Sequence, residues 1–308
     1  MTPDVPKTPL ARATSRFRGH LLARASLLFL LLLALAAIAA PWIENWLGVN
    51  AMTADLFNAR MPPSGANWLG TDEAGRDLLT RLLHGGRVTL LVALSSALVS
   101  ACIGAAIGLL AGLGGGRLDA VLMRLTDAVI ALPVLPLLFI LAALDLAKLG
   151  LPSDLAQSQA AGLWRIVLII ALFGWPTVAR LVRAEALSLI RRDFVRAAVA
   201  LGAGKGAIAL RHLLPNLASP IIVATTLSVG NIILFESVLS FLGLGISPPI
   251  PSWGNMLSNA EEMIWSAPRL AIWPGVMIFL TVIAFNFLGD GLQDALDPKS
   301  DADRGRGG

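Results

Sequence analysis

The sequence predicts an all-α integral membrane protein with six transmembrane helices in one membrane domain. Hydrophobic residues make up 56% of the 308-residue chain and charged residues 14%, whereas a soluble domain carries about 25% charged residues. Six apolar runs are each long enough to cross about 30 Å of hydrocarbon at about 1.5 Å per residue. These runs are Ala25–Ile43, Val88–Gly112, Val121–Ala147, Trp164–Val182, Leu217–Leu242 and Leu270–Gly289.

Basic residues that flank the runs predict the orientation of the chain. Loops rich in Lys and Arg remain in the cytoplasm, and basic residues outnumber acids before the first run and between the fourth and fifth. They are Lys7, Arg12, Arg16, Arg18 and Arg24 in the first stretch, and Arg191, Arg192, Arg196, Lys205 and Arg211 in the second. Six crossings return the acid-rich tail to the same side. We therefore expect a multi-pass protein of the cytoplasmic (inner) membrane with both termini in the cytoplasm.

Four parts of the chain are expected. Residues 1–20 and 298–308 are rich in Pro, Arg, Asp and Gly without apolar periodicity, which is typical of disordered ends. Residues 21–87 would form an N-terminal transmembrane anchor with an outer interfacial segment, and residues 88–297 a five-helix domain. The first run could instead be a cleaved signal peptide, because a basic stretch precedes it and Ala37-Ile38-Ala39 is similar to a cleavage site.

The first outer segment contains a polar motif, Gly70-Thr71-Asp72-Glu73-Ala74-Gly75-Arg76-Asp77. Leucines follow it at helical spacing beside several arginines, so we expect an amphipathic helix at the outer surface of the membrane. The acids of the motif lack the alternate-residue spacing of a calcium loop. No metal site is expected.

The second run has a face of small residues. Its members recur every four residues and favour close helix packing over a substrate path. They are Ser96, Ser100, Gly104, Gly108 and Gly112.

The third run contains two prolines, Pro133 and Pro136, which are expected to bend it. Near its start, Arg124 lies at helical spacing from both Asp119 and Asp127. We expect a structural ion cluster in which Arg124 pairs with either acid.

Residues 188–216 lie between apolar runs but are too polar and too rich in glycine to span a bilayer. Asp193 suits the N-cap of a short helix over Phe194–Leu201, and Gly202 can adopt the left-handed conformation that ends it. A second short helix is expected from about Gly206 to Pro215, because proline cannot continue a helix. Two short helices with small side chains along the membrane face predict a docking surface for another protein.

The glycines at 202, 204 and 206 do not form a nucleotide-binding loop. A phosphate-binding loop requires Gly at the position of Val199 and Ser or Thr at the position of Gly206. This loop is therefore not expected to bind ATP.

This segment resembles the cytoplasmic coupling loop of binding-protein-dependent ABC importer permeases. The resemblance rests on Arg196-Ala197-Ala198, on Gly202 four residues later, and on Leu214-Pro215-Asn216. The chain departs from the family pattern at Arg196, where many members have Glu, and at His212, where the general pattern has Ile. The 70–77 motif is similar to a signature of the dipeptide, oligopeptide and nickel branch, and residues 211–216 are similar to its second, C-type, permease subunit.

The resemblance implies a type I importer fold with short cytoplasmic coupling helices, and ATP-driven import of a di- or oligopeptide. Nickel or another small solute remains the alternative substrate. The implied partners are a homologous second permease subunit, two cytoplasmic ATP-binding subunits, an extracytoplasmic solute-binding protein and membrane lipid, and no nucleic acid. This chain would bind no cofactor and carry no catalytic residue, because ATP and Mg²⁺ would lie on the partner ATPases.

The residues implied in ATPase coupling share the 193–216 segment. They are Arg196, Ala197, Ala198, Gly202, Lys205, Arg211, Leu214, Pro215 and Asn216.

The fifth run carries polar residues, of which Ser228, Asn231 and Glu236 are candidates for a transport path or for hydrogen bonds between helices. A carboxyl group inside a membrane is a functional candidate by default. A structural role in interhelical hydrogen bonding has equal weight for Glu236. An ion-coupled secondary transporter or channel that uses Glu236 is therefore the alternative function.

Overall fold

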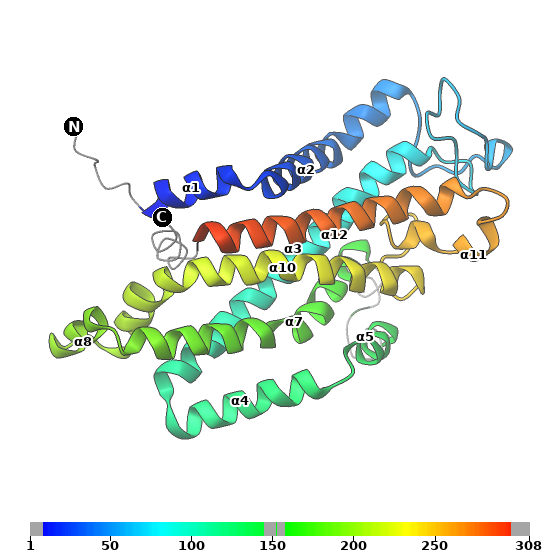
Figure 1. Cartoon of the computed structure of the whole chain (residues 1–308). Helices are drawn as coiled ribbons and strands as arrows, with labels where there is room; N and C mark the ends of the chain where they lie inside the picture. The colour runs from blue at the N-terminus through cyan, green and yellow to red at the C-terminus, as the bar shows by residue number, and fades with distance from the viewer. Residues whose placement is uncertain (1–8, 145–151, 153–157, 297–308) are drawn as a thin grey trace, which may run out of the picture.

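The structure is a computed structural model that describes residues 9–144, 152 and 158–296 (Figure 1). Regular structure within these residues is helical, apart from one isolated bridge between Thr71 and Asp77. The elements are α1 (Pro9–Gly19), α2 (Leu21–Leu47), η1 (Leu56–Asn58), α3 (Leu78–Gly114), α4 (Gly116–Ala131), α5 (Val134–Ala143), α7 (Gln159–Ile190), α8 (Asp193–Ala200), α9 (Lys205–Ala207), η2 (Ile208–Leu213), α10 (Leu214–Phe241), η3 (Asn255–Leu257), α11 (Ala260–Met263) and α12 (Arg269–Leu296). The predicted all-α fold is confirmed.

Five helical stretches are long and apolar enough to cross a membrane. They are α2, α3, α7, the continuous stretch from α9 through α10, and α12. These helices share one core, which contains Leu33, Val92, Ile170, Ile233 and Phe285 from five different elements. α8 lies at one end of the bundle, together with α1 and the last turns of α12, and α11 lies at the opposite end (Figure 1).

The third apolar run is broken into two helices. α4 and α5 meet at an angle of 85°, and Leu132 between them has extended backbone angles, φ −75° and ψ 141°. Pro133 explains the break, because proline disfavours a helical conformation in the residue before it. Pro136 lies in the first turn of α5, where proline is tolerated. The expected bend is therefore confirmed at Pro133 and wrong at Pro136, and residues 145–147 lie outside the described residues.

The acids of α4 pair with α7. Arg183 donates to both carboxylate oxygens of Asp119, with a distance of 2.6 Å from Nη2 to Oδ2, and Arg180 contacts Asp127. The expected pairing with Arg124 inside α4 is wrong, because the two arginines of the neighbouring helix reach these carboxylates. The ion pairs connect α4, at the edge of the bundle in Figure 1, to α7.

α1 forms where disorder was expected. The prediction for residues 1–20 is wrong over residues 9–19, which are helical. A Cβ on Gly291 of α12 would lie 3.7 Å from the ring of Phe17, and His20 lies 2.9 Å from Asp294 of α12. Such tertiary contacts stabilise short helices that composition does not predict. Residues 1–8 and 298–308 lie outside the described residues.

α3 starts ten residues before the apolar run that predicted it. The expected interfacial helix after Asp77 is wrong, since Leu78 begins a single helix that continues to Gly114. Leu82 is buried in the common core. Arg81 is also buried, lies 3.1 Å from Asp72 and donates to the Ala51 carbonyl at 3.1 Å. Because this arginine is paired and hydrogen-bonded, its face of the helix can pack inside the protein. The predicted boundary between residues 87 and 88 thus falls within α3.

The small-residue face of α3 packs directly on α7. A Cβ on Gly104 would lie 2.6 Å from the Trp175 carbonyl oxygen, and a Cβ on Gly108 would lie 2.6 Å from that of Ala179. Such distances leave no room for a side chain. The preferred interpretation of these residues as a helix-packing face is confirmed.

Candidate docking site and polar residues of the spans

α8 ends in the geometry that the sequence predicts. Gly202 has a φ of +86°. Its N–H donates to the Val199 carbonyl at 2.9 Å, and the Ala203 N–H donates to the Ala198 carbonyl at 3.0 Å. These two bonds make a Schellman motif, which requires a left-handed residue at Gly202.

The start of α8 differs from the prediction. The N-cap is Arg192, and its side chain makes no capping hydrogen bond. Asp193 lies in the first turn instead, where its negative charge suits the positive end of the helix dipole. The expected Asp193 cap is therefore wrong.

The second helix of the segment does not end at Pro215. α9, η2 and α10 are continuous from Lys205 to Phe241, and η2 is π-helical. The Leu214 N–H donates to the Ala209 carbonyl, five residues earlier, and the Asn216 side chain donates to the His212 carbonyl at 2.7 Å. The wider turns accommodate a proline that would interrupt a regular α-helix. The second part of the candidate docking segment, from residue 205 onward, is thus the first part of a spanning helix.

A second hydrophobic cluster fixes the inner face of this segment to the bundle. It joins α8, η2 and α10 to α7 through buried side chains. Its members are Val178, Val182, Ala186, Val195, Ile208, Leu213 and Leu217. α8 and η2 are therefore packed against the end of α7, together with the start of α10.

The outer face of the segment is exposed and carries most of the residues expected in coupling. Arg196, Ala197, Gly202, Lys205, Arg211, Pro215 and Asn216 are exposed, and Ala198 and Leu214 are partly buried.

Large apolar side chains lie among these exposed residues. The exposed fractions are 44% for Phe194, 55% for Val199, 89% for Leu201 and 66% for Leu210. Sequence reasoning missed them because it considered only small and basic residues. The sequence does indicate them, because apolar residues occur on more than one face of this short polar segment.

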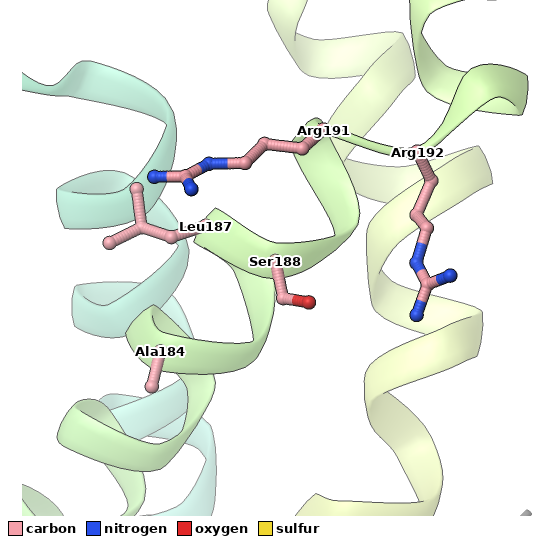
Figure 2. Close-up of a pocket in the computed structure, with 5 residues that line it drawn as sticks. All are labelled: Ala184, Leu187, Ser188, Arg191 and Arg192. Carbon is pink, nitrogen blue, oxygen red and sulfur yellow. The ribbon is translucent and has the colours of Figure 1, made fainter.

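A pocket of about 450 Å³ lies at the end of α7, beside the start of α8. Figure 2 shows the side chain of Arg191 extending to the left of this helix end and that of Arg192 running downward on its right, with Ser188 between them and Leu187 and Ala184 on the left. Both arginines are exposed. The border of the docking segment is therefore basic.

The motif at residues 70–77 folds around the carboxylate of Asp72. This side chain accepts hydrogen bonds from the backbone N–H groups of Ala74 and Arg76, both at 2.9 Å. Its other oxygen lies 2.8 Å from Nε of Arg76 and 3.1 Å from Nε of Arg81. Asp72 is thus satisfied by its own loop and by the first turn of α3.

The other residues of the motif also hold the loop. Gly70 and Gly75 have φ values of +80° and +77°. The Thr71 hydroxyl accepts from the Met61 N–H at 2.8 Å, and Asp77 caps α3 by accepting from the Thr80 N–H at 2.8 Å. These contacts give the motif a structural role at the α11 end of the bundle.

Glu236 is fully buried in α10. Its carboxyl group accepts hydrogen bonds from Ser240 at 2.7 Å and from Thr89 of α3 at 3.3 Å. Thr89 also accepts from the backbone N–H of Trp253 at 3.2 Å. This arrangement favours the interpretation of Glu236 as a residue that joins helices.

The other two polar candidates of α10 differ from each other. The Ser228 hydroxyl donates to the Thr225 carbonyl of its own helix at 2.7 Å. Asn231 is exposed. The structure therefore does not gather Ser228, Asn231 and Glu236 into one site.

No group of three or more His, Cys, Asp or Glu side chains within the described ranges could hold a metal ion. The single cysteine, Cys102, is exposed on α3. Apolar spanning helices, a bent helix pair and an exposed segment packed on two of the spans define a multi-pass membrane protein.

Comparison with known proteins identifies the family. Residues 104–301 match the binding-protein-dependent transport system inner membrane component family, and residues 8–63 match the N-terminal transmembrane domain of oligopeptide transport permease C. The chain belongs to this family of ABC importer permeases, in its C-type oligopeptide branch, and has the type I importer fold. The predicted family and fold are therefore confirmed.

Similar proteins are permeases by name. A protein of Brucella suis biovar 1 (strain 1330), provisionally named a peptide permease, is 41% identical over 95% of this chain and 92% of its own length. The glutathione transport system permease protein GsiD of Shigella flexneri serotype 5b (strain 8401) is 40% identical over 96% of this chain and 93% of its length. GsiD of Escherichia coli O6:K15:H31 is 39% identical, with the same coverage.

Proposed function

We propose that this chain is half of the pore of an ATP-driven importer and receives the motion of partner ATPases through residues 193–216. The observation that carries the proposal is the two-sided packing of this segment. Val195, Ile208 and Leu213 bury its inner face against the bundle, while its outer face exposes Leu201 and Leu210 to solvent. An exposed apolar patch on a polar segment is typical of a protein interface.

The continuity of Lys205–Phe241 supports a mechanical role. Because α9, η2 and α10 form one helix, a displacement of the docking segment moves α10 with it. At the far end of α10, Glu236 bonds to Thr89 of α3. Closure of the ATPase dimer on ATP would therefore move the two ends of the pore together and expose the path alternately to each side.

The basic residues of the segment support an acidic surface on the partner ATPase. Arg196, Lys205 and Arg211 are exposed on the docking face, and Arg191 and Arg192 lie at its border. The N–H donors of a guanidinium group lie in one plane and match the two oxygens of a carboxylate, so exposed arginines pair well with acidic side chains. We infer that the ATPase cleft that receives this segment is acidic.

Membership of the family supports a proposal for the remaining assembly. A homologous second permease would complete the pore, two ATP-binding subunits would lie on the cytoplasmic α8 side with ATP and Mg²⁺, and a solute-binding protein would deliver solute at the α11 side. Both termini would be cytoplasmic. The names of the similar proteins refer to peptide and glutathione, and both are chains of amino acids. We therefore propose di- and oligopeptides as substrates, with nickel and other small solutes as the alternative.

Cysteine cross-linking tests the docking proposal. Ala197→Cys in a Cys102→Ala background, expressed with the neighbouring transporter subunits, should form a cross-link to an ATPase subunit. Ser266→Cys, which is exposed near the α11 end, is the matched control and should not. Cross-linking of the ATPase to position 266, or to neither position, would contradict the proposal.

A further inference from the structure

One face of α2 is apolar and exposed along most of the helix. Its large side chains recur every three or four residues, and each is more than half exposed. They are Leu28, Leu31, Leu32, Leu35, Ile38, Trp42 and Trp46. Of the five described spanning stretches, α2 also has the smallest buried share, 22%. This face therefore needs an apolar cover from outside the chain.

The residues on this face favour lipid over another helix as the cover. Helix contacts within a membrane use small residues that let two backbones approach. α2 has such residues on its opposite face, where Ala23, Ala37 and Ala40 are buried. The only ionisable residue between positions 28 and 46 is Glu44, which points to α3 and lies 2.7 Å from His84. The exposed face is thus large, apolar and uncharged, as a surface in contact with acyl chains requires.

The two tryptophans of this face lie at the edge of the hydrocarbon. The apolar run of α2 ends at Ile43, just after Trp42 and three residues before Trp46. Three helical residues measure about 4.5 Å, and the headgroup layer on each side of the hydrocarbon is about 5–7 Å thick. Trp46 therefore lies at the level of the headgroups, where tryptophan is enriched in membrane proteins.

A third tryptophan, from the loop between α2 and α3, joins them at this level. The ring of Trp68 meets that of Trp46 edge to face, with ring centroids 6.2 Å apart and planes at 89°, which is a favoured arrangement of aromatic rings. Trp68 remains 53% exposed and Trp46 75%. The pair therefore offers a broad aromatic surface at the height of the headgroups.

Trp68 is held in place by the loop around it. The side chain of its neighbour Asn67 donates to Asp77 at 2.9 Å, and the Gly70 N–H donates to the Asn67 carbonyl at 3.0 Å. Asp77 in turn caps α3. The position of Trp68 is thus tied to the start of α3 as well as to the end of α2.

We propose that lipid covers the exposed face of α2, and that Trp46 and Trp68 anchor the loop between α2 and α3 in the headgroup layer. The ligand of this surface is a phospholipid. Its acyl chains cover the leucines, and its polar oxygens accept from the indole N–H groups. The anchor goes beyond the proposed import function and does not depend on it. It holds the start of the 70–77 motif at a fixed height above the hydrocarbon.

Spin labels test which phase surrounds the pair. A nitroxide is attached to Trp46→Cys, Trp68→Cys or the control Phe57→Cys, each in proteoliposomes of the complete transporter in which Cys102 and all partner cysteines are replaced. Phe57 belongs to the same loop but is 100% exposed on η1, which lies beyond the end of α2 (Figure 1). Oxygen, which dissolves in lipid, should relax the labels at 46 and 68 more than a water-soluble nickel chelate does. The order should be reversed at 57.

Tryptophan fluorescence tests the pair without a label. In lipids brominated close to the headgroup, Trp68→Phe should remove a quenched component, so the quenched fraction of the remaining fluorescence should fall. Trp175→Phe is the control, because Trp175 is buried in α7. Removing this shielded indole should raise the quenched fraction.

The outcomes separate lipid from water and from a protein partner. Stronger relaxation by the chelate at 46 and 68 would show that the pair lies in water, and weak relaxation by both reagents would show that another subunit covers it. Either result, or an unchanged quenched fraction in Trp68→Phe, would overturn the inference. ATP-driven uptake is measured separately, and its absence in the wild type would contradict the proposed function while leaving the lipid anchor intact.

Discussion

The hydroxyl of Thr89 in α3 donates a hydrogen bond to the carboxyl group of Glu236 in α10 over 3.3 Å. Thr89 accepts from the backbone of Trp253, and Ser240 donates to the second oxygen of Glu236. A fully buried carboxyl group thus connects two spanning helices and the loop before η3. This network favours a structural role for Glu236 in joining helices.

Glu236→Gln should therefore keep most of the uptake, since the amide oxygen can still accept from Thr89 or Ser240. Glu236→Leu removes the acceptor of Thr89, Ser240 and Ser252 and should lower the stability of the purified complex by about 1–3 kcal/mol, because buried hydroxyls lose their hydrogen bonds. Thermal unfolding and ATP-driven uptake of both variants check this. An inactive but fully stable Gln variant would indicate that the acid itself is required.

Gly108→Leu should disrupt the contact between α3 and α7. A Cβ at this position would lie 2.6 Å from the Ala179 carbonyl oxygen and 2.8 Å from Cβ of Val182, and overpacking of this kind typically costs about 1–3 kcal/mol. Gly275→Ala in α12 is the control, since a Cβ there meets nothing within 4 Å. Equal melting temperatures for the two variants would show that the helices are not in close contact.

The ion pair of Asp119 with Arg183 should couple α4 to α7. A double-mutant cycle with Asp119→Asn and Arg183→Gln is expected to give a coupling energy of about 1 kcal/mol or more in thermal unfolding. The same cycle on Asp127 and Arg180 should give less, because both side chains are about half exposed and solvent screens the pair. A larger coupling energy for the exposed pair would contradict the observed contacts.

Gly202→Leu should uncouple transport from ATP hydrolysis. The φ of +86° at Gly202 is strained for leucine, and the glycine is exposed on the docking face. Uptake should fall at least ten-fold while the permease still inserts into the membrane. Gly204→Ala is the control, because Gly204 has a φ of −71° and no neighbour within 4 Å of a Cβ. Wild-type uptake and ATPase co-purification in Gly202→Leu would exclude Gly202 from the docking surface.

Local chemistry made much of the fold predictable. Span positions follow from apolar runs, the end of α8 follows from Gly202, and the break after α4 follows from Pro133, since each depends on residues close in sequence. The wrong predictions concern structure that depends on contacts between residues far apart in the sequence. Arg183 reaches Asp119 from 64 positions away, and α1 forms on contacts with α12.

The shape of the candidate docking segment was not predicted. The sequence placed the end of its second helix at Pro215, whereas a π-helical segment continues the helix through this proline. Proline in the sequence normally predicts the end of a helix, and nothing in the local sequence shows that wider helical turns will accommodate Pro215.

Uptake by the reconstituted transporter is the most direct test of the central claim. The complete wild-type complex in proteoliposomes is supplied with solute-binding protein, labelled trialanine, and ATP on the α8 side, while an ionophore collapses the proton gradient. We expect uptake that requires ATP, requires the binding protein and is unchanged by the ionophore. Uptake that proceeds without ATP and stops when the gradient is collapsed would contradict the account and favour an ion-coupled carrier.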